Sequence, residues 1–202
     1  MINIVALGPG HKDYILPVAT KQIDKSEYIL GFSRAVDCFE DSKAIKVKVK
    51  SLKEISDFIL ENDDKEVSIL ASGDPLFYGI TNYIKSHYNG KVNVIPGISS
   101  FQYFMAKLAK PWQGAELGSL HGREEAFLDV VGDKKLSIWL TDNKNTPQSL
   151  CKRLFENKIE AKIYIGENLS YEDERITSGT PSELMNGEFT ILSVFVVERP
   201  GE

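Results

Sequence analysis

The chain has 202 residues, 42% hydrophobic and 26% charged, which is enough for one large or two small α/β domains. Its formal net charge of −5 disfavours non-specific binding to nucleic-acid backbones. Two widely separated cysteines, Cys38 and Cys151, do not suggest a disulfide framework, and no apolar run approaches the ~20 residues that span a bilayer, so we expect a cytoplasmic protein without membrane contact.

The first half of the chain alternates short apolar runs with segments of helical period, a pattern that is typical of βαβ units and a largely parallel sheet. Strands are predicted at residues 2–7, 28–32, 44–49, 67–71 and 92–95. Helices are predicted to cover residues 17–25 and to extend from a Ser33 cap to 39 and from a Ser51–Glu54 capping box to 62. Another follows the Gly73-Asp74-Pro75 corner toward 87, and the last extends from a Ser99–Gln102 capping box to 109.

The segment Lys110-Pro111-Trp112 interrupts this pattern, and we place a domain boundary there. It divides the chain into domains of residues 1–112 and 113–202. The second domain is predicted to hold strands at 116–120, 135–140, 161–165 and 189–197, the last of them a central or hairpin-forming strand. Three helices are predicted in this domain. The first ends near 131, the second covers 147–157 with Thr146 as its cap, and the third begins at a Thr180–Glu183 capping box. The predicted fold class is therefore α/β, with two α/β domains.

Glycine-containing corners follow three of the predicted strands: Gly8-Pro9-Gly10, Gly73-Asp74-Pro75 and Pro96-Gly97. A single corner of this kind is more often a plain turn than a site. Ligands of open α/β sheets bind beyond the carboxyl ends of the strands, where glycine lets them approach the backbone. The three corners together favour a shared cleft, although their spacing is neither that of a P-loop nor that of a dinucleotide fingerprint.

The stretches "VALGPG", "SGDPLFYG" and "VIPGISS", in this order, resemble the tetrapyrrole methylases, which methylate intermediates of cobalamin and sirohaem synthesis with S-adenosylmethionine. The resemblance covers essentially the whole chain. "PWQGAELGSLHGR" and "GENLSYEDERITSG" further resemble segments of the members that methylate C-5 of the corrin ring. The resemblance implies an active-site cleft between two α/β domains, and methylation of C-5 of a (cobalt-)precorrin-7 type macrocycle in cobalamin biosynthesis.

The resemblance also implies which residues bind S-adenosylmethionine, the co-substrate. They are Ser72, Gly73, Asp74, Ser99 and Ser100 in the first half, and Leu140, Gly166, Glu167, Asn168 and Leu169 in the second. Asp74 either accepts a hydrogen bond from the amine or ribose of the donor or braces its own loop, and both alternatives stay open. Phe77 and Tyr78 are expected to pack beneath the loop, on a helix, rather than to stack on adenine.

A tetrapyrrole substrate carries many carboxylates, so an acidic protein must bind it through local cations. The candidate cations are His11 and Lys12 beside Gly10, Arg34, and His121 with Arg123. The predicted substrate-binding set is Gly8, Pro9, Gly10, His11, Arg34 and Arg123. Arg123 is suited to bidentate carboxylate recognition, whereas Arg34 could equally be a helix-surface charge. If the reaction uses a general base, His121 is the candidate. No His/Cys cluster predicts a protein-bound metal.

Further expectations concern partners and alternatives. The resemblance implies a homodimer, and the lack of a second nucleotide-binding pattern implies a stand-alone C-5 enzyme, with a separate C-15 methylase and decarboxylase in the same pathway. Relatives in the superfamily methylate RNA or protein substrates, but the acidic charge and the "SLHGR" segment weigh against both. A non-catalytic tetrapyrrole or nucleotide carrier on the same fold is the alternative of a different class.

Overall fold

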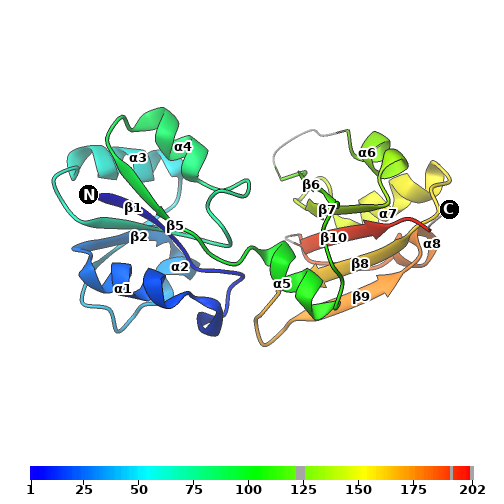
Figure 1. Ribbon diagram of the computed structural model, residues 1–202, viewed down its shortest axis with the longest axis horizontal. Coiled ribbons are helices and arrows are strands. Elements are labelled where there is room, and N and C mark those ends of the chain that lie inside the picture. Colours follow the sequence, from blue (N-terminus) through cyan, green and yellow to red (C-terminus); the bar gives the residue numbers. More distant parts are fainter. Residues whose placement is uncertain (122–125, 192, 201–202) are drawn as a thin grey trace. The chain divides into compact units, whose positions relative to one another are not determined.

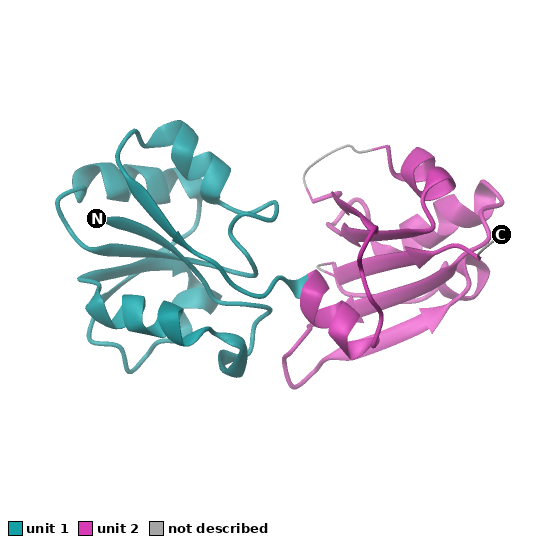
Figure 2. Cartoon of the chain, in the orientation of Figure 1, with its two compact units in different colours: residues 1–100 teal, residues 101–202 magenta. Residues whose placement is uncertain are grey.

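The strands of this protein form two five-stranded sheets, seen in a computed structural model that describes residues 1–121, 126–191 and 193–200 (Figure 1). The chain divides into two compact units, residues 1–100 and 101–202 (Figure 2). The predicted α/β class is thus confirmed. The division falls at the start of helix α5 (Ser100–Lys107), earlier than Pro111, and the boundary between independently folding domains stays a prediction.

The sheet of the first unit is parallel throughout and has the strand order β3-β2-β4-β1-β5. Its strands are β1 (Ile2–Ala6), β2 (Tyr28–Phe32), β3 (Ile45–Val49), β4 (Val67–Ala71) and β5 (Val92–Ile95). Strands β1 and β4 are buried along their whole length, as expected for near-continuous apolar runs in the middle of a parallel sheet. The exposed Lys46 and Lys48 lie on the edge strand β3, where charge discourages pairing with another sheet.

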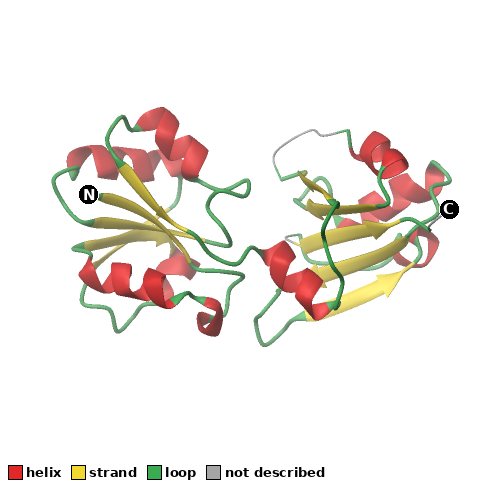
Figure 3. Ribbon diagram, viewed as in Figure 1, coloured by secondary structure: helices red, strands yellow, loops and turns green. Residues whose placement is uncertain are grey.

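Helices cover both faces of this sheet (Figure 3). On one face, α1 (Pro17–Lys25) and α2 (Ser33–Asp37) contribute to a core with Val5 and Leu70. On the other, α3 (Leu52–Glu61) and α4 (Thr81–His87) pack around Ile4 and Ile69. Neighbouring strand residues therefore enter opposite cores, as the two-residue period of a strand requires. A short 3₁₀ helix, η1 (Lys12–Tyr14), precedes α1.

The second unit has the strand order β6-β7-β10-β8-β9. Its strands are β6 (Glu116–Ser119), β7 (Leu136–Leu140), β8 (Lys162–Glu167), β9 (Arg175–Gly179) and β10 (Ser193–Glu198). Strand β6 is parallel to β7, whereas β10 runs antiparallel to both β7 and β8. The prediction of a central strand near the carboxyl end of the chain is confirmed, because β10 occupies the middle of the sheet.

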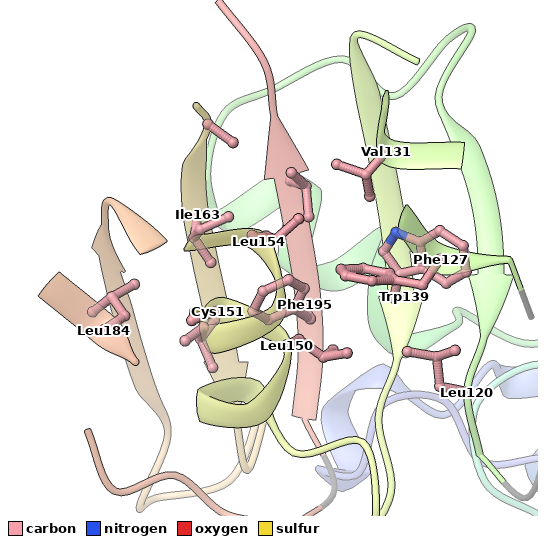
Figure 4. Packing of buried hydrophobic residues seen from close by; sticks show 13 residues of the cluster. Leu120, Phe127, Val131, Trp139, Leu150, Cys151, Leu154, Ile163, Leu184 and Phe195 are labelled. Atoms are coloured by element: carbon pink, nitrogen blue, oxygen red, sulfur yellow. The ribbon is translucent and has the colours of Figure 1, made fainter. Parts of the chain in front are cut away.

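One face of the second sheet packs against α6 (Phe127–Asp133), α7 (Pro147–Glu156) and α8 (Pro181–Leu184). Figure 4 shows this core, in which the rings of Trp139, Phe127 and Phe195 meet. The Phe127 and Trp139 rings stand edge to face with centroids 5.1 Å apart, a geometry that aromatic quadrupoles favour. The opposite face carries α5, since Gly166 of β8 alternates with the core residue Ile165 and lies under Phe104.

Several local predictions need correction. Ser33 is the first helical residue of α2 and not its cap, which is Phe32 in an extended conformation. Strand β10 begins at Ser193, four residues later than predicted, and strand β8 runs from 162 to 167 rather than from 161 to 165. Strand β9 was not predicted at all. Its sequence "RITSG" is short, polar and largely exposed, so it lacks the apolar run that marks a buried strand.

Three predicted helix starts are confirmed by their hydrogen bonds. The side chains of Ser51 and Thr146 accept from backbone N–H groups of the first turns of α3 and α7. Thr180 and Glu183 form a complete capping box, with the Glu183 carboxylate accepting the Thr180 N–H at 2.7 Å. Each cap satisfies donors that the helix cannot pair internally.

Among the described residues, no helix is both long enough and apolar enough to cross a membrane.

The two cysteines should differ sharply in reactivity. Cys151 is fully buried in the second core, and burial raises the pKa of its thiol to about 12, whereas Cys38 is exposed. Because the thiolate is the reacting species, a disulfide reagent such as DTNB should modify Cys38 alone in the native protein and both thiols after denaturation. Spectrophotometric titration of wild type and of Cys38→Ser measures this. A fast native reaction that survives in Cys38→Ser would contradict it.

Candidate active site

The three glycine corners lie side by side at one edge of the first sheet. They follow β1, β4 and β5, which are neighbours in the order β4-β1-β5 and run parallel, so their carboxyl ends meet. Strand β1 leads to α1 on one face, while its neighbour β4 leads to α4 on the other. Adjacent strands whose connections leave to opposite faces form a crevice at their carboxyl ends, the usual ligand site of such sheets.

Backbone contacts hold the corners together. The Gly73 N–H donates to the Gly8 carbonyl at 2.8 Å, and both residues have left-handed backbones, with φ of +66° and +72°. At Gly97 there is no room for a side chain, since a Cβ would lie 2.5 Å from Ala6 Cβ and 3.0 Å from the Gly73 carbonyl oxygen. The sequence therefore needs glycine at these positions to bring three loops into contact.

The start of α5 adjoins these corners. A Cβ on Gly73 would lie 3.9 Å from Ser99 Cα and 4.0 Å from the Ser100 nitrogen, so the third loop passes beside the second. Ser99 is buried, and Ser100 is the first residue of α5. The first N–H groups of a helix lack partners within the helix and favour negative charge or hydrogen-bond acceptors. The structure thus brings Gly73, Ser99 and Ser100 together, and their role in binding S-adenosylmethionine stays a prediction.

The loop after β4 is braced by its own side chains. Asp74 Oδ1 accepts the Leu76 N–H at 2.8 Å, and Thr81 Oγ1 donates to the Pro75 carbonyl at 2.8 Å. Of the two alternatives for Asp74, loop bracing is therefore present in the structure, and a contact with the donor stays a prediction. Ser72, next to this loop, is exposed.

Phe77 and Tyr78 were predicted to lie on a helix, and this is wrong. Both lie in the loop before α4, whose first residue is Thr81. Tyr78 has a left-handed backbone with φ of +52° and is 37% exposed, and the two rings meet edge to face at 5.0 Å. The error arises because "FYG" extends the loop beyond the Gly-Asp-Pro corner, so that the helix begins later than the apolar pattern indicates.

The predicted substrate-binding residues of the first unit occupy the same sheet edge. Pro9 and Gly10 follow Gly8, and His11 caps η1 by accepting the Asp13 N–H at 3.3 Å on Nδ1. Arg34 is exposed in α2, directly after the carboxyl end of β2. In the sheet, β2 is separated from β1 by β4, so Arg34 lies two strands away from the Gly8 corner. Arg123 lies outside the described residues.

In the second unit, the predicted residues gather at the carboxyl ends of β6, β7 and β8. Leu140 and Gly166 are both paired with Val194 of β10, so they lie in one row across the sheet. Ser119 of β6 pairs with Leu140, and His121 follows two residues later, exposed, with its N–H 3.3 Å from Ser119 Oγ. The antiparallel strand β10 therefore aligns residues that are far apart in the sequence.

Glu167 is committed to interactions within the protein. Its buried carboxylate accepts from Arg175 Nε at 2.5 Å, from Arg175 Nη2 at 2.8 Å and from the Thr190 N–H at 2.7 Å. Hydrogen bonding to Glu167 raises the pKa of the Arg175 guanidinium. A bidentate arginine–carboxylate pair of this kind fixes both partners, so any donor contact at Glu167 falls to its backbone. Asn168 and Leu169 follow in a loop, Leu169 buried and Asn168 bonded to Asp173 at 2.7 Å.

Sequence reasoning missed Arg175, the partner of Glu167, and Glu174, which holds the same loop. Both stand at the end of the acidic run "ENLSYEDER", in which the single arginine among acids was a signal for an ion pair. Among the described residues, no group of three or more His, Cys, Asp and Glu side chains could hold a metal ion.

A cavity of about 980 Å³ lies elsewhere on the second unit. It is lined by the amino ends of β7 and β8 and by the carboxyl end of β10, through residues such as Lys135, Ala161 and Arg199. This is the opposite end of the strands from Leu140 and Gly166, so the cavity is separate from the predicted donor residues.

A family model described as tetrapyrrole (corrin/porphyrin) methylases matches residues 1–185. The chain belongs to this family. Among curated methylases, the chain is 32% identical to a Methanocaldococcus jannaschii protein named "Probable cobalt-precorrin-7 C(5)-methyltransferase", over 100% of both chains. It is 29% identical to the cobalt-precorrin-7 C(5)-methyltransferase of Salmonella typhimurium, over 98% of this chain and 100% of that one.

Further relatives of this methylase show how its fold recurs. The crystal structure of the precorrin-6Y methylase of Archaeoglobus fulgidus has a TM-score of 0.79 and 22% identity, over 100% of this chain and 99% of that one. A uroporphyrin-III C-methyltransferase of Thermus thermophilus, crystallised with S-adenosylhomocysteine, has a TM-score of 0.81 and 16% identity, over 98% and 96%. The decarboxylating precorrin-6Y C(5,15)-methyltransferase of Sinorhizobium is 29% identical over 65% of this chain and 33% of its own length.

The Gly97→Ala substitution should destabilise this methylase. Its new methyl group would overlap Ala6 and the Gly73 carbonyl, which belong to the buried strand β1 and to a hydrogen-bonded corner, and overpacking of this kind costs about 1–3 kcal/mol. Urea unfolding followed by circular dichroism measures the loss. Gly132→Ala is the control, because a Cβ there meets open space within α6. Equal stability of Gly97→Ala and wild type would contradict the packing described here.

Proposed function

We propose that this protein transfers a methyl group from S-adenosylmethionine to C-5 of a precorrin-7 type macrocycle, cobalt-bearing or not, in cobalamin biosynthesis. The observation that carries the proposal is the match along the full length of both chains to a relative named for this reaction, at 32% identity. The glycine corners at the crevice of the first sheet support it, since they offer backbone donors without side chains in the way.

The donor supplies a methyl group bonded to a positively charged sulfur, which reacts by in-line displacement. Catalysis of such a step rests mainly on holding two reactants in the right geometry. Because the sulfur loses its charge as the reaction proceeds, a fixed anion beside it would favour the ground state over the transition state. Backbone and apolar contacts suit this requirement, and Glu167, the buried acid of the predicted set, is already neutralised by Arg175.

The residues proposed to bind the donor fall into two groups. The corner group of the first unit comprises Ser72, Gly73, Asp74, Ser99 and Ser100. The sheet-edge group of the second unit comprises Leu140, Gly166, Glu167, Asn168 and Leu169. The structure supports each group by the mutual proximity of its members, described above, and the Thermus thermophilus relative supports the choice of ligand, since it was crystallised with the demethylated donor.

On the substrate side, carboxylates of the macrocycle would meet Gly8, Pro9, Gly10, His11, Arg34 and Arg123. Arginine is suited to this task because its guanidinium binds carboxylates in a bidentate manner. C-5 of the reduced macrocycle can act as the carbon nucleophile with electrons from the pyrrole nitrogens. If a proton must be removed, His121 is the proposed base, exposed at the carboxyl end of β6.

The proposal extends to assembly and pathway. We infer a homodimer in the cytoplasm, with apolar surface of the second unit at the interface. We also infer that a separate protein methylates C-15 and removes the acetate carboxyl group. The alignment with only 33% of the decarboxylating Sinorhizobium relative supports this division of labour.

Titration calorimetry with S-adenosylhomocysteine tests the donor site. Wild type should bind with a dissociation constant in the micromolar range, and Gly73→Val should abolish binding, since a β-branched residue disfavours the left-handed backbone at this corner and would intrude toward Ser99 and Ser100. Gly114→Val is the matched control, because Gly114 also has a left-handed backbone (φ of +77°) but faces open space. Folded wild type that binds no ligand, or Gly73→Val that binds as well as wild type, would contradict the proposed site.

The reaction itself is tested with methyl-labelled S-adenosylmethionine and a precorrin-7 type macrocycle, with and without cobalt. We expect one labelled methyl group on the product by mass spectrometry, and nuclear magnetic resonance should locate it at C-5. Binding of donor and macrocycle without transfer would instead identify a carrier. Transfer to another ring carbon would contradict the assigned position.

A further inference from the structure

The carboxylate of Glu174 holds the loop that follows β8. Oε2 accepts the Ser170 N–H at 2.7 Å, and Oε1 forms an ion pair with Lys107 Nζ at 3.1 Å. The Tyr103 hydroxyl donates to the same carboxylate, and the Glu174 side chain is only 16% exposed. Tyr103 and Lys107 both belong to α5, so one side chain ties this loop to that helix.

The loop needs such support because its backbone is strained. Asn168 and Ser170 have left-handed backbones with φ of +46° and +71°, although neither is glycine. Conformations of this kind persist only where surrounding contacts determine them. Here these contacts are the hydrogen bond between Asn168 and Asp173 and the hydrogen bond from the Ser170 N–H to the Glu174 carboxylate.

Helix α5, which Glu174 contacts, has at its amino end two residues that are predicted to bind S-adenosylmethionine. Ser99 and Ser100, beside the Gly73 corner, immediately precede or begin α5. Further along α5, Phe104 covers Gly166, where an added Cβ would lie 2.8 Å from Phe104 Cδ2 and 2.8 Å from Leu169 Cδ2. Helix α5 therefore follows the corner group directly in the chain, and it packs on β8 and the loop after it within the second unit.

We propose that Glu174 is a positioning residue for donor binding, which sets the backbone of residues 166–169 by fixing Ser170 to Tyr103 and Lys107 of α5. The inference rests on the function proposed above. Glu174 itself need not touch the donor, since it acts through the loop. Its three hydrogen-bonding partners converge on one carboxylate, whereas a surface glutamate with a purely solubilising role has no such set.

The ionised state suits this task. Burial acts to raise the pKa of Glu174, but hydrogen bonds from Tyr103, the Ser170 N–H and Lys107 outweigh it and hold the pKa below the usual value. The side chain is thus a carboxylate at neutral pH and can accept from all three groups. Glutamine keeps the shape but loses the charge and half of the accepting capacity, and alanine loses every contact.

The experiment compares Glu174→Gln, Glu174→Ala and Lys107→Met with wild type by titration calorimetry with S-adenosylhomocysteine, together with thermal unfolding and amide exchange at Ser170. Alanine should raise the dissociation constant about tenfold or more, with smaller increases for glutamine and for Lys107→Met, because a charge-assisted hydrogen-bond network is lost stepwise. Exchange at the Ser170 amide should accelerate in the same order, while amides of the β7–β10 core keep their protection. Glu172→Gln is the matched control, as it removes the same charge from an exposed position of the same loop and should leave affinity within about twofold.

The outcomes separate this inference from the proposed function. Wild type that fails to bind would overturn the function. Wild type that binds, with Glu174→Ala and Lys107→Met binding equally well, would overturn the positioning role alone. Weaker binding accompanied by general loss of core protection would also count against it, because the effect would then be structural. If the Glu174→Ala variant does not fold, the affinities of Glu174→Gln and Lys107→Met decide, and unchanged affinity in both overturns the proposal.

Discussion

The contact between the Gly73 N–H and the Gly8 carbonyl is the interaction on which the proposed site depends. It joins the loops after β1 and β4, and Gly97 closes against both from the third side. None of these three positions tolerates a side chain without strain or overlap. This edge of the sheet is therefore built from backbone, and its arrangement is set by the parallel order of β4, β1 and β5.

The second unit reaches a similar result by different means. Its residues at the carboxyl ends of β7 and β8 are aligned by β10, which pairs Leu140 and Gly166 with the same valine. Its loops are held by buried or half-buried acids, Glu167 and Glu174, that are satisfied by protein donors. Protein donors thus compensate the formal charges of these acids, which agrees with the demands of the proposed methyl transfer.

The sequence alone was informative where apolar runs and glycine are decisive. The buried strands β1 and β4 and the corners after them could be located because a parallel strand between two helical layers must be apolar throughout. Strand β9 could not be located from the sequence, because an exposed polar edge strand has no apolar pattern. The alignment of Leu140 with Gly166 could not be predicted either, because it depends on β10 pairing between β7 and β8. The contacts of Glu174 were not predicted from the sequence, because they depend on a loop conformation with two strained residues.

The position of β10 has a consequence for synthesis on the ribosome. All five strands of the first sheet have been made by residue 95, so the first unit can acquire its sheet while translation continues. The second sheet lacks its middle until residues 193–198 emerge, and until then β7 and β8 have no partner between them. Nascent chains should therefore pass through a stage in which one half is folded and the other still exposes apolar strands, when chaperones would have most to protect.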